Sequence, residues 1–206
     1  MQNDQTQNVD ELHSQRAPQR ALRPVMFYLI VALVFFSDQI SKAWIKDALP
    51  RRPNGEMPII GDAFLLSLTH NHGGAWGVLP QGNYLFVVFA AFAIVALIIA
   101  YHRMQRIELL VGTAFALALG GAAGNLLDRL RYGSVVDFFY VKIINFPIFN
   151  VADSAITVGI LLLFFHFLRT AREEDKMEAD KREEDKTKAA KAETYSAEAA
   201  PAKLTE

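Results

Sequence analysis

The chain of 206 residues contains no cysteine. This absence excludes a disulfide framework, a thiol nucleophile and thiolate metal ligands. The chain also has no surplus of charge of one sign, since 21 Lys+Arg face 22 Asp+Glu and the formal net charge is −1. We therefore expect no nucleic-acid partner, because binding to phosphates favours a strongly basic surface.

Polar residues are concentrated at the two ends of the chain. From residue 171 onward, 11 acidic and 8 basic residues make up a charged tail, so the body is more apolar than the overall 52% suggests. Residues 1–20 are polar and lack the zones of a cleavable signal peptide. We predict a polar N-terminal tail over 1–20, a membrane domain over 21–170, and a charged tail over 171–206. That second tail is expected to be a fraying helix or disordered.

Four mostly apolar segments have the length of about 20 residues that a helix needs to cross a bilayer core. They run over residues 24–44, 84–101, 109–127 and 149–168. A soluble helical bundle is the alternative, but its helices need a polar face, and the second segment has none. We therefore predict an all-α membrane protein built on a bundle of four transmembrane helices.

Two local patterns add detail to this fold. In the third segment, small residues recur every four positions at Gly112, Ala116, Gly120 and Gly124. Such a stripe allows helix backbones to approach closely in lipid, so we expect this helix to be central. Residues 55–77 contain strand-like stretches at 59–60 and 64–69, broken by Gly and Pro, which predict a small β-rich region at the membrane surface.

Polar side chains gather at one end of the predicted helices, where their burial is costly and by default indicates function. They are Asp38, Lys42, Asn125, Asp128, Arg129, Asn150 and Asp153, together with Asn71 and Asp137 in the connecting loops. Because successive helices alternate in direction, these ends all meet on one side of the membrane. This convergence predicts a functional site there.

Several of these residues also have a purely structural interpretation. Asp38 and Lys42 are four residues apart, which favours an ion pair within one helix. Asn150 is suited to cap a helix, with the carboxylate of Asp153 three residues further on. Asp128 at a helix C-terminus opposes the helix dipole, so it needs a cation from the adjacent arginine or from a neighbouring helix.

Asp137 lies between Val136 and Phe138, an apolar setting with no local cation. We predict that it pairs with Asp153 across the loop between the third and fourth helices. Two close carboxylates do not both ionise easily, so they share one proton. Such a pair can activate a water and polarise a scissile carbonyl group.

Other chemistries are less well supported. His70 and His72 lie two residues apart in a loop, and without a third ligand we expect no metal site. A small transporter or proton pathway is the main alternative function, because buried Asp, Asn and Arg also suit ion relays. An assembly protein that docks through the glycine stripe is a third possibility, but it leaves Asp137 and Asp153 unexplained.

The chain resembles the lipoprotein signal peptidase (signal peptidase II) family in five blocks that follow the family's order. These blocks are Asp38-Gln39-Ile40-Ser41-Lys42, Asn71-His72-Gly73-Gly74-Ala75-Trp76, Gly124-Asn125-Leu126-Leu127-Asp128-Arg129, Val135-Val136-Asp137-Phe138 and Phe149-Asn150-Val151-Ala152-Asp153-Ser154. The resemblance covers residues 24–168. It departs from the family at Trp76, where phenylalanine is more usual, and in the long charged tail.

The resemblance implies an aspartic endopeptidase that needs no cofactor and no metal. Asp137 and Asp153 would be its catalytic pair. Asn71, Asn125, Arg129 and Asn150 would line or brace the site, with support from Asp38, Lys42 and Asp128.

The resemblance also implies the substrate and the location. The substrate would be a prolipoprotein whose signal peptide is cut on the amino side of a diacylglyceryl-modified cysteine. The enzyme would lie in the bacterial inner membrane among its lipids, with its site and the extracytoplasmic β-rich region at the outer face and both termini, including the charged tail, in the cytoplasm. We expect it to work as a monomer. A substrate anchored by its lipid is held in two dimensions, which presents the scissile bond at the depth of the site.

Overall fold

The computed structural model describes residues 22–52, 55–73, 82–104 and 107–198. It divides into two compact units, Met1–Leu163 and Phe164–Glu206, and each is considered by itself. The predicted tail over residues 1–20 lies outside the described residues, as do Gly74, Ala75 and Trp76 of the second block.

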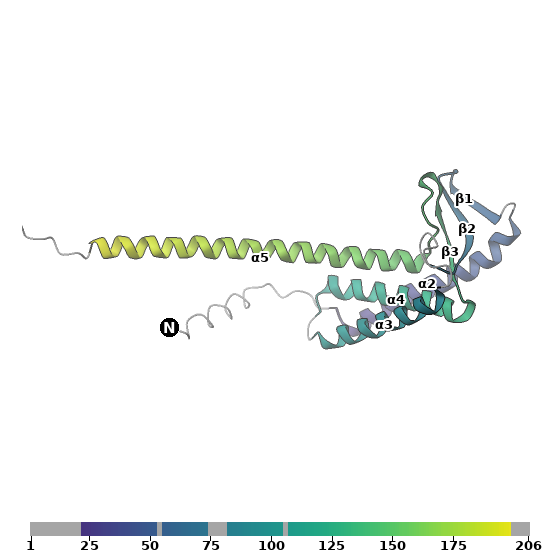
Figure 1. Cartoon of the computed structure of the whole chain (residues 1–206), viewed down its shortest axis with the longest axis horizontal. Helices are drawn as coiled ribbons and strands as arrows, with labels where there is room; N and C mark the ends of the chain where they lie inside the picture. Colours follow the sequence, from purple (N-terminus) through teal and green to yellow (C-terminus); the bar gives the residue numbers. More distant parts are fainter. Residues whose placement is uncertain (1–21, 53–54, 74–81, 105–106, 199–206) are drawn as a thin grey trace, which may run out of the picture. The chain divides into compact units, whose positions relative to one another are not determined.

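Four long helices are present where the apolar segments predict them (Figure 1). They are α2 (Pro24–Ala48), α3 (Asn83–Arg103), α4 (Leu109–Tyr132) and α5 (Val151–Glu198). All four are long and apolar enough to cross a membrane, so the predicted fold class is confirmed. Helices α2 and α4 extend four and five residues beyond the predicted ends at 44 and 127, because a helix also continues through polar turns outside the apolar stretch.

The helix ends follow from local sequence. Pro24 is the first residue of α2, where its missing N–H costs nothing and its fixed φ suits the helix. Helix α4 ends at Tyr132 and is followed by Gly133, which adopts φ +67° and donates its N–H to the carbonyl oxygen of Arg129 at 3.1 Å. A left-handed residue at this position favours glycine, so the chain can turn directly into the next strand.

Helix α4 is central in the first unit, as the small-residue stripe predicts. A Cβ atom built at Gly120 would lie 2.8 Å from the carbonyl oxygen of Val31 in α2. On another face, a Cβ atom at Gly121 would lie 2.5 Å from the carbonyl oxygen of Ala152 in α5. Helix α3 also packs against α4. Glycine therefore allows close backbone contact on two faces of α4.

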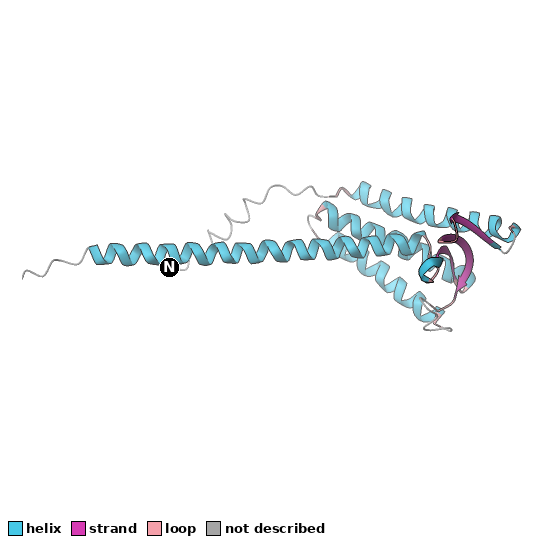
Figure 2. Ribbon diagram, turned by 90° about the horizontal axis from the view of Figure 1, so that it is seen from above, coloured by secondary structure: helices cyan, strands magenta, loops and turns pink. Residues whose placement is uncertain are grey.

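A three-stranded antiparallel sheet lies at one end of the bundle of α2, α3 and α4, beside the last turns of α2 (Figures 1 and 2). Its strands, in the order β1-β2-β3, are β1 (Glu56–Ile60), β2 (Phe64–Asn71) and β3 (Val135–Val141). The first two were predicted, whereas the sequence interpretation placed His70, Asn71 and Asp137 in loops. His70 and Asn71 are the last two residues of β2, and Asp137 lies in β3. That interpretation is wrong, because six of the seven residues of β3 are β-branched or aromatic and favour a strand.

Two sets of contacts fix the sheet against the helices. Ile45, Leu49, Leu66 and Phe138 form a buried apolar cluster that joins the end of α2 to β2 and β3. Phe149 then pairs with Phe139 of β3, donating its N–H to the carbonyl oxygen at 3.1 Å and accepting the Phe139 N–H at 2.7 Å. This bridge brings the start of α5 beside the middle of β3.

The second unit consists of the later part of α5, which remains helical through Glu198. Residues 171–198 therefore form a helix, one of the two forms expected for the charged tail. Exposed ion pairs four residues apart support it, between Arg169 and Glu173 at 2.9 Å and between Arg182 and Glu178 at 3.5 Å.

Candidate active site

A cavity of about 580 Å³ opens where α4, α5, β2 and β3 meet. It is lined by Asn71, Asn125, Arg129, Val135, Asp137, Phe146, Pro147, Ile148, Phe149, Asp153, Ser154, Thr157 and Val158. Five of the nine polar residues singled out in the sequence therefore share one cavity. Asp137 and Asp153, the predicted pair, are both among them.

The carboxyl group of Asp137 is positioned by β3 and held by two asparagines. Asp137 pairs with Thr69 of β2 in the sheet, and it is only 2% exposed. Asn71 Nδ2 donates to Asp137 Oδ2 at 3.0 Å, and Asn150 Nδ2 donates to Asp137 Oδ1 at 2.7 Å. Both oxygens therefore have an amide donor.

Burial raises the pKa of Asp137 from its ordinary value of 3.8 to about 7. The negative charge of Asp153 raises this pKa further, which indicates that the two carboxyl groups act on each other. The hydrogen bonds from Asn71 and Asn150 and the positive charge of Lys42 oppose the increase. At neutral pH, Asp137 is thus poised between its protonated and ionised forms.

Asp153 is positioned by the first turn of α5. Its backbone N–H donates to Asn150 Oδ1 at 2.9 Å, while the Asn150 N–H donates back to Asp153 Oδ2 at 3.1 Å. This reciprocal pair caps the helix, so the predicted capping role of Asn150 is confirmed. Asn125 Nδ2 donates to the other carboxyl oxygen, Oδ1, at 2.7 Å.

Asn150 connects the two carboxyl groups directly. Its backbone N–H reaches Asp153 and its side-chain amide reaches Asp137. The residue is fully buried, and its amide also donates to Asn125 Oδ1 at 3.1 Å. One residue therefore serves both as a helix cap and as a bridge between the two acids.

A buried ion cluster lies behind the cavity. Lys42 Nζ is 2.8 Å from Asp38 Oδ2, which confirms the predicted pair within one helix. It is also 2.9 Å from Asp128 Oδ2, so the cation that Asp128 needs comes from a neighbouring helix. Asp38 accepts the N–H of Ala152 at 3.0 Å, and Asp128 accepts that of Val136 at 3.1 Å. The cluster thereby joins α2, α4, β3 and α5.

Two neighbours of the cavity were not anticipated from the sequence. The Arg129 guanidinium lies over the ring of Phe86 in α3, 5.0 Å from its centre. Thr157 lines the cavity one turn beyond Asp153, and its spacing of four residues from Asp153 was a signal that the sequence already contained. Phe86 carried no such signal, because it is one of many apolar residues in α3. His70 and His72 do not line the cavity.

Residues 30–169 match the family model described as Signal peptidase (SPase) II. The chain belongs to this family. The match covers more than half of the chain. It includes Asp137 and Asp153 as well as all the residues of the ion cluster. The resemblance to signal peptidase II is therefore confirmed, and membership implies a peptidase.

Relatives in this family are similar over most of their own length. The lipoprotein signal peptidase of Moorella thermoacetica is 39% identical over 150 residues, which cover 73% of this chain and 97% of the relative. The lipoprotein signal peptidase of Caulobacter vibrioides is 41% identical over 156 residues, covering 73% and 89%. The charged tail accounts for much of the remainder of this chain.

Two solved structures of bacterial membrane enzymes share the fold of this signal peptidase II homologue. One superimposes with a TM-score of 0.68 at 28% identity and covers 75% of this chain and 94% of its own. The other gives a TM-score of 0.65 at 28% identity and covers 74% and 98%. These findings favour the peptidase interpretation over the transporter.

Proposed function

We propose that this chain is an aspartic endopeptidase of the membrane, with Asp137 and Asp153 as its catalytic pair. The observation that carries the proposal is that both carboxyl groups face one cavity and are linked through Asn150. Each of the four carboxyl oxygens accepts one hydrogen bond from an asparagine amide or N–H. Among the described residues, the second lone pair of each oxygen is available for a proton or a water.

The pair would hold one proton below about pH 7, because Asp137 resists ionisation in its buried site. The ionised carboxylate takes a proton from a water as that water attacks the scissile carbonyl carbon. The protonated carboxyl group donates to the carbonyl oxygen as negative charge develops there. When the tetrahedral intermediate collapses, the leaving nitrogen receives a proton and the C–N bond breaks.

The substrate we propose is a lipid-modified prolipoprotein, cut on the amino side of its diacylglyceryl-modified cysteine. The name of the relatives, lipoprotein signal peptidase, supports this class of substrate. The cavity wall formed by Phe146, Ile148, Phe149 and Val158 is apolar, which suits a signal peptide and its lipid. The polar side of the same cavity carries the two acids.

The location we propose is the bacterial inner membrane, with the site at the outer face, both termini in the cytoplasm, and the chain working as a monomer. An even number of candidate spans supports this location, because both ends of the chain would then lie on one side of the membrane. The cavity lies at the other side, since it is built from the end of α4 and the start of α5. A cut on a translocated prolipoprotein requires the outer face.

The test is cleavage of a diacylglyceryl-modified prolipoprotein by the purified protein in lipid vesicles. Asp137→Asn and Asp153→Asn should each abolish cleavage, because one carboxyl group cannot serve as both acid and base. Asp47→Asn is the matched control, since Asp47 is an exposed residue paired with Arg51. Full turnover in either of the first two variants would rule out the pair and direct attention to Asp128.

A chelator arm tests the absence of a metal in the mechanism. The wild-type protein should cleave at the same rate with and without a strong chelator of divalent cations. Strong inhibition by the chelator would bring His70 and His72 back as ligands. The two arms together separate an acid pair from a metal-assisted hydrolase.

A further inference from the structure

The orientations of three asparagine amides around the two acids are fixed by groups that can only donate hydrogen bonds. The oxygen of Asn71 accepts the N–H of Gly73 at 3.1 Å, and the oxygen of Asn150 accepts the N–H of Asp153 at 2.9 Å. Each amide nitrogen must then point the other way, towards Asp137. A backbone N–H has no acceptor capacity, so the flipped amides would lose these bonds.

The third amide is held by a charge. Asn125 Oδ1 accepts from Lys42 Nζ at 2.9 Å, and an ammonium group has three donors and no acceptor. The Asn125 amide nitrogen must therefore face Asp153, which it reaches at 2.7 Å. Lys42 is 2% exposed, and its contacts with Asp38, Asp128 and Asn125 match its three N–H donors. These three contacts hold the ammonium group of Lys42 in one position.

The two acids consequently have different surroundings. Asp153 receives a donor that is polarised by a cation, and hydrogen bonds that follow one another in a chain strengthen each other. It also lies in the first turn of α5, where the helix dipole favours negative charge. Asp137 lies in a strand between the buried side chains of Val136 and Phe138, and both of its donors are neutral amides.

The other charged groups that face the pair do not remove this difference. Asp38 of α2 and Asp128 of α4 are each paired with Lys42. Arg129 of α4 stands on the cavity wall and acts on both acids. Among the described residues, Lys42 also acts on both acids through space, and Asp153 acts on Asp137.

We propose that Lys42 is a positioning residue that acts through the amide of Asn125 and makes Asp153 the ionised base, which leaves the shared proton on Asp137. This assignment rests on the proposed function, and it adds which of the two acids is the base and which one holds the proton. Asp153 takes the proton of the attacking water, and Asp137 donates to the carbonyl oxygen. On collapse, Asp153 passes its proton to the leaving nitrogen and Asp137 recovers its own.

The first test locates the proton by infrared spectroscopy and needs no activity. In Asp137→Asn, the carboxyl absorption of Asp153 is followed against pH, and in Asp153→Asn that of Asp137 is followed. Spectra of the double variant are subtracted to remove the other carboxyl groups. Asp153 should ionise at lower pH than Asp137. The reverse order would overturn the proposal.

The second test removes the connecting amide. Asn125→Ala in the Asp137→Asn background should move the ionisation of Asp153 upward by about one to two pH units, the size expected for one lost hydrogen bond to a charged group. Asn71→Ala in the Asp153→Asn background is the matched control, because it removes one neutral donor from Asp137. An unchanged Asp153 after removal of Asn125 would contradict the proposal.

The third test concerns Lys42 itself. It distinguishes an effect of Lys42 on the ionisation of Asp153 from a purely structural role. In the active protein, Asn125→Ala and Lys42→Met should move the acid limb of the kcat profile to higher pH, whereas loss of support alone would lower kcat equally at every pH. Gln39→Met is the control, since Gln39 donates to Asp38 and Asp128 but not to Asn125. A thermal melt identifies a Lys42→Met protein that fails to fold, in which case Asn125→Ala decides.

Failure of this proposal and failure of the proposed function give different results. A wild-type protein that does not cleave prolipoprotein removes the function, while the infrared order of the two acids still stands or falls by itself. Cleavage abolished by both aspartate substitutions, combined with Asp137 ionising first, retains the function and rejects the roles assigned here.

Discussion

The backbone of Gly124 in α4 lies directly against the carboxyl group of Asp38 in α2. A Cβ atom built at Gly124 would be 2.5 Å from Asp38 Oδ2 and 3.2 Å from its carboxyl carbon. The same carboxyl group holds Lys42 at 2.8 Å and the N–H of Ala152 at 3.0 Å, so it cannot move without breaking these bonds. The glycine thus makes room for the ion cluster, as well as for the close packing of two helices.

Gly124→Ala should destabilise the protein by roughly 1–3 kcal/mol, because the methyl group displaces a buried, hydrogen-bonded carboxyl group. The measurement is unfolding by heat or denaturant in detergent. The same change in an Asp38→Ala background should cost less, since the clashing group is gone. Equal costs in both backgrounds would show that the clash is elsewhere.

The stability of the protein should fall as pH rises from about 4 to about 7. The folded pKa of Asp137, about 7, lies above its ordinary value of 3.8, so the folded state binds a proton more tightly than the unfolded state. The stabilisation is therefore present at low pH and is lost as the carboxyl group ionises, up to about 4 kcal/mol for such a shift. Asp137→Asn should flatten this dependence, whereas Asp47→Asn should leave it unchanged.

Cleavage activity should decline as pH rises through about 7, where Asp137 gives up its proton. Without that proton, neither acid can donate to the carbonyl oxygen, and two adjacent negative charges face the substrate. The measurement is kcat against pH with a lipid-modified substrate in vesicles. A rate that keeps rising well above pH 7 would contradict a protonated Asp137.

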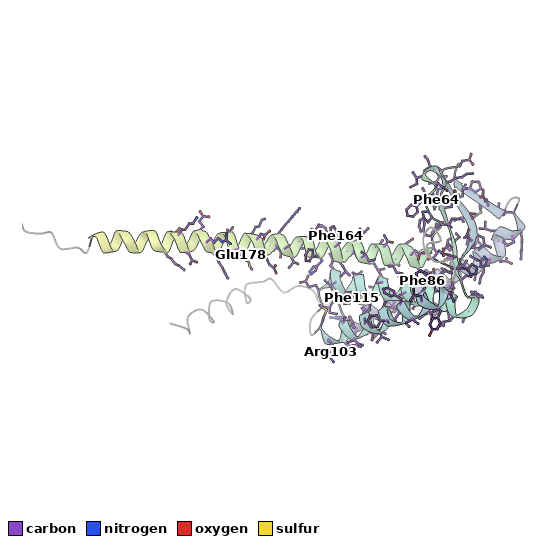
Figure 3. The ribbon with its side chains drawn as sticks, in the orientation of Figure 1. Phe64, Phe86, Arg103, Phe115, Phe164 and Glu178 are labelled. Atoms are coloured by element: carbon purple, nitrogen blue, oxygen red, sulfur yellow. The ribbon has the colours of Figure 1, made fainter. Side chains whose placement is uncertain are left out.

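Phe86→Leu should raise KM roughly two- to fivefold, the effect of losing an Arg129–ring interaction of about 0.5–1 kcal/mol. Phe86, labelled in Figure 3, supplies the face on which the guanidinium rests at the cavity wall. Phe86→Tyr should retain the normal KM because it keeps the ring. Phe92→Leu on the same helix is the matched control, since Phe92 is exposed.

A chain that ends at Lys176 should cleave at the normal rate. The described residues that line the cavity lie between Asn71 and Val158 in the sequence, and the family match ends at residue 169. The helix beyond that point is stabilised by its own exposed pairs, such as Arg182 with Glu178. A loss of activity with an unchanged melting temperature would assign the tail a role in substrate delivery.

Much of the polar site could be read from the sequence because each residue is costly to bury where it lies. Asp38 and Lys42 pair within one helix, and Asn150 caps the next, so both relations depend only on local spacing. For Asp128, the sequence predicted only that its partner is a cation from the adjacent arginine or from a neighbouring helix. The structure supplies Lys42 from another helix, a relation between residues 86 positions apart.

The sequence by itself determined the four apolar helices, the small-residue face of α4 and the polar residues at the helix ends, because bilayer thickness and helical period act on neighbouring residues. Only the tertiary structure decided which side chains meet. The strand β3 and its bridge from Phe139 to Phe149 bring Asp137 to Asn150 and the start of α5. Such hydrogen bonds require donor and acceptor atoms on separate elements to be placed to within a few tenths of an ångström. That geometry arises only when the elements pack.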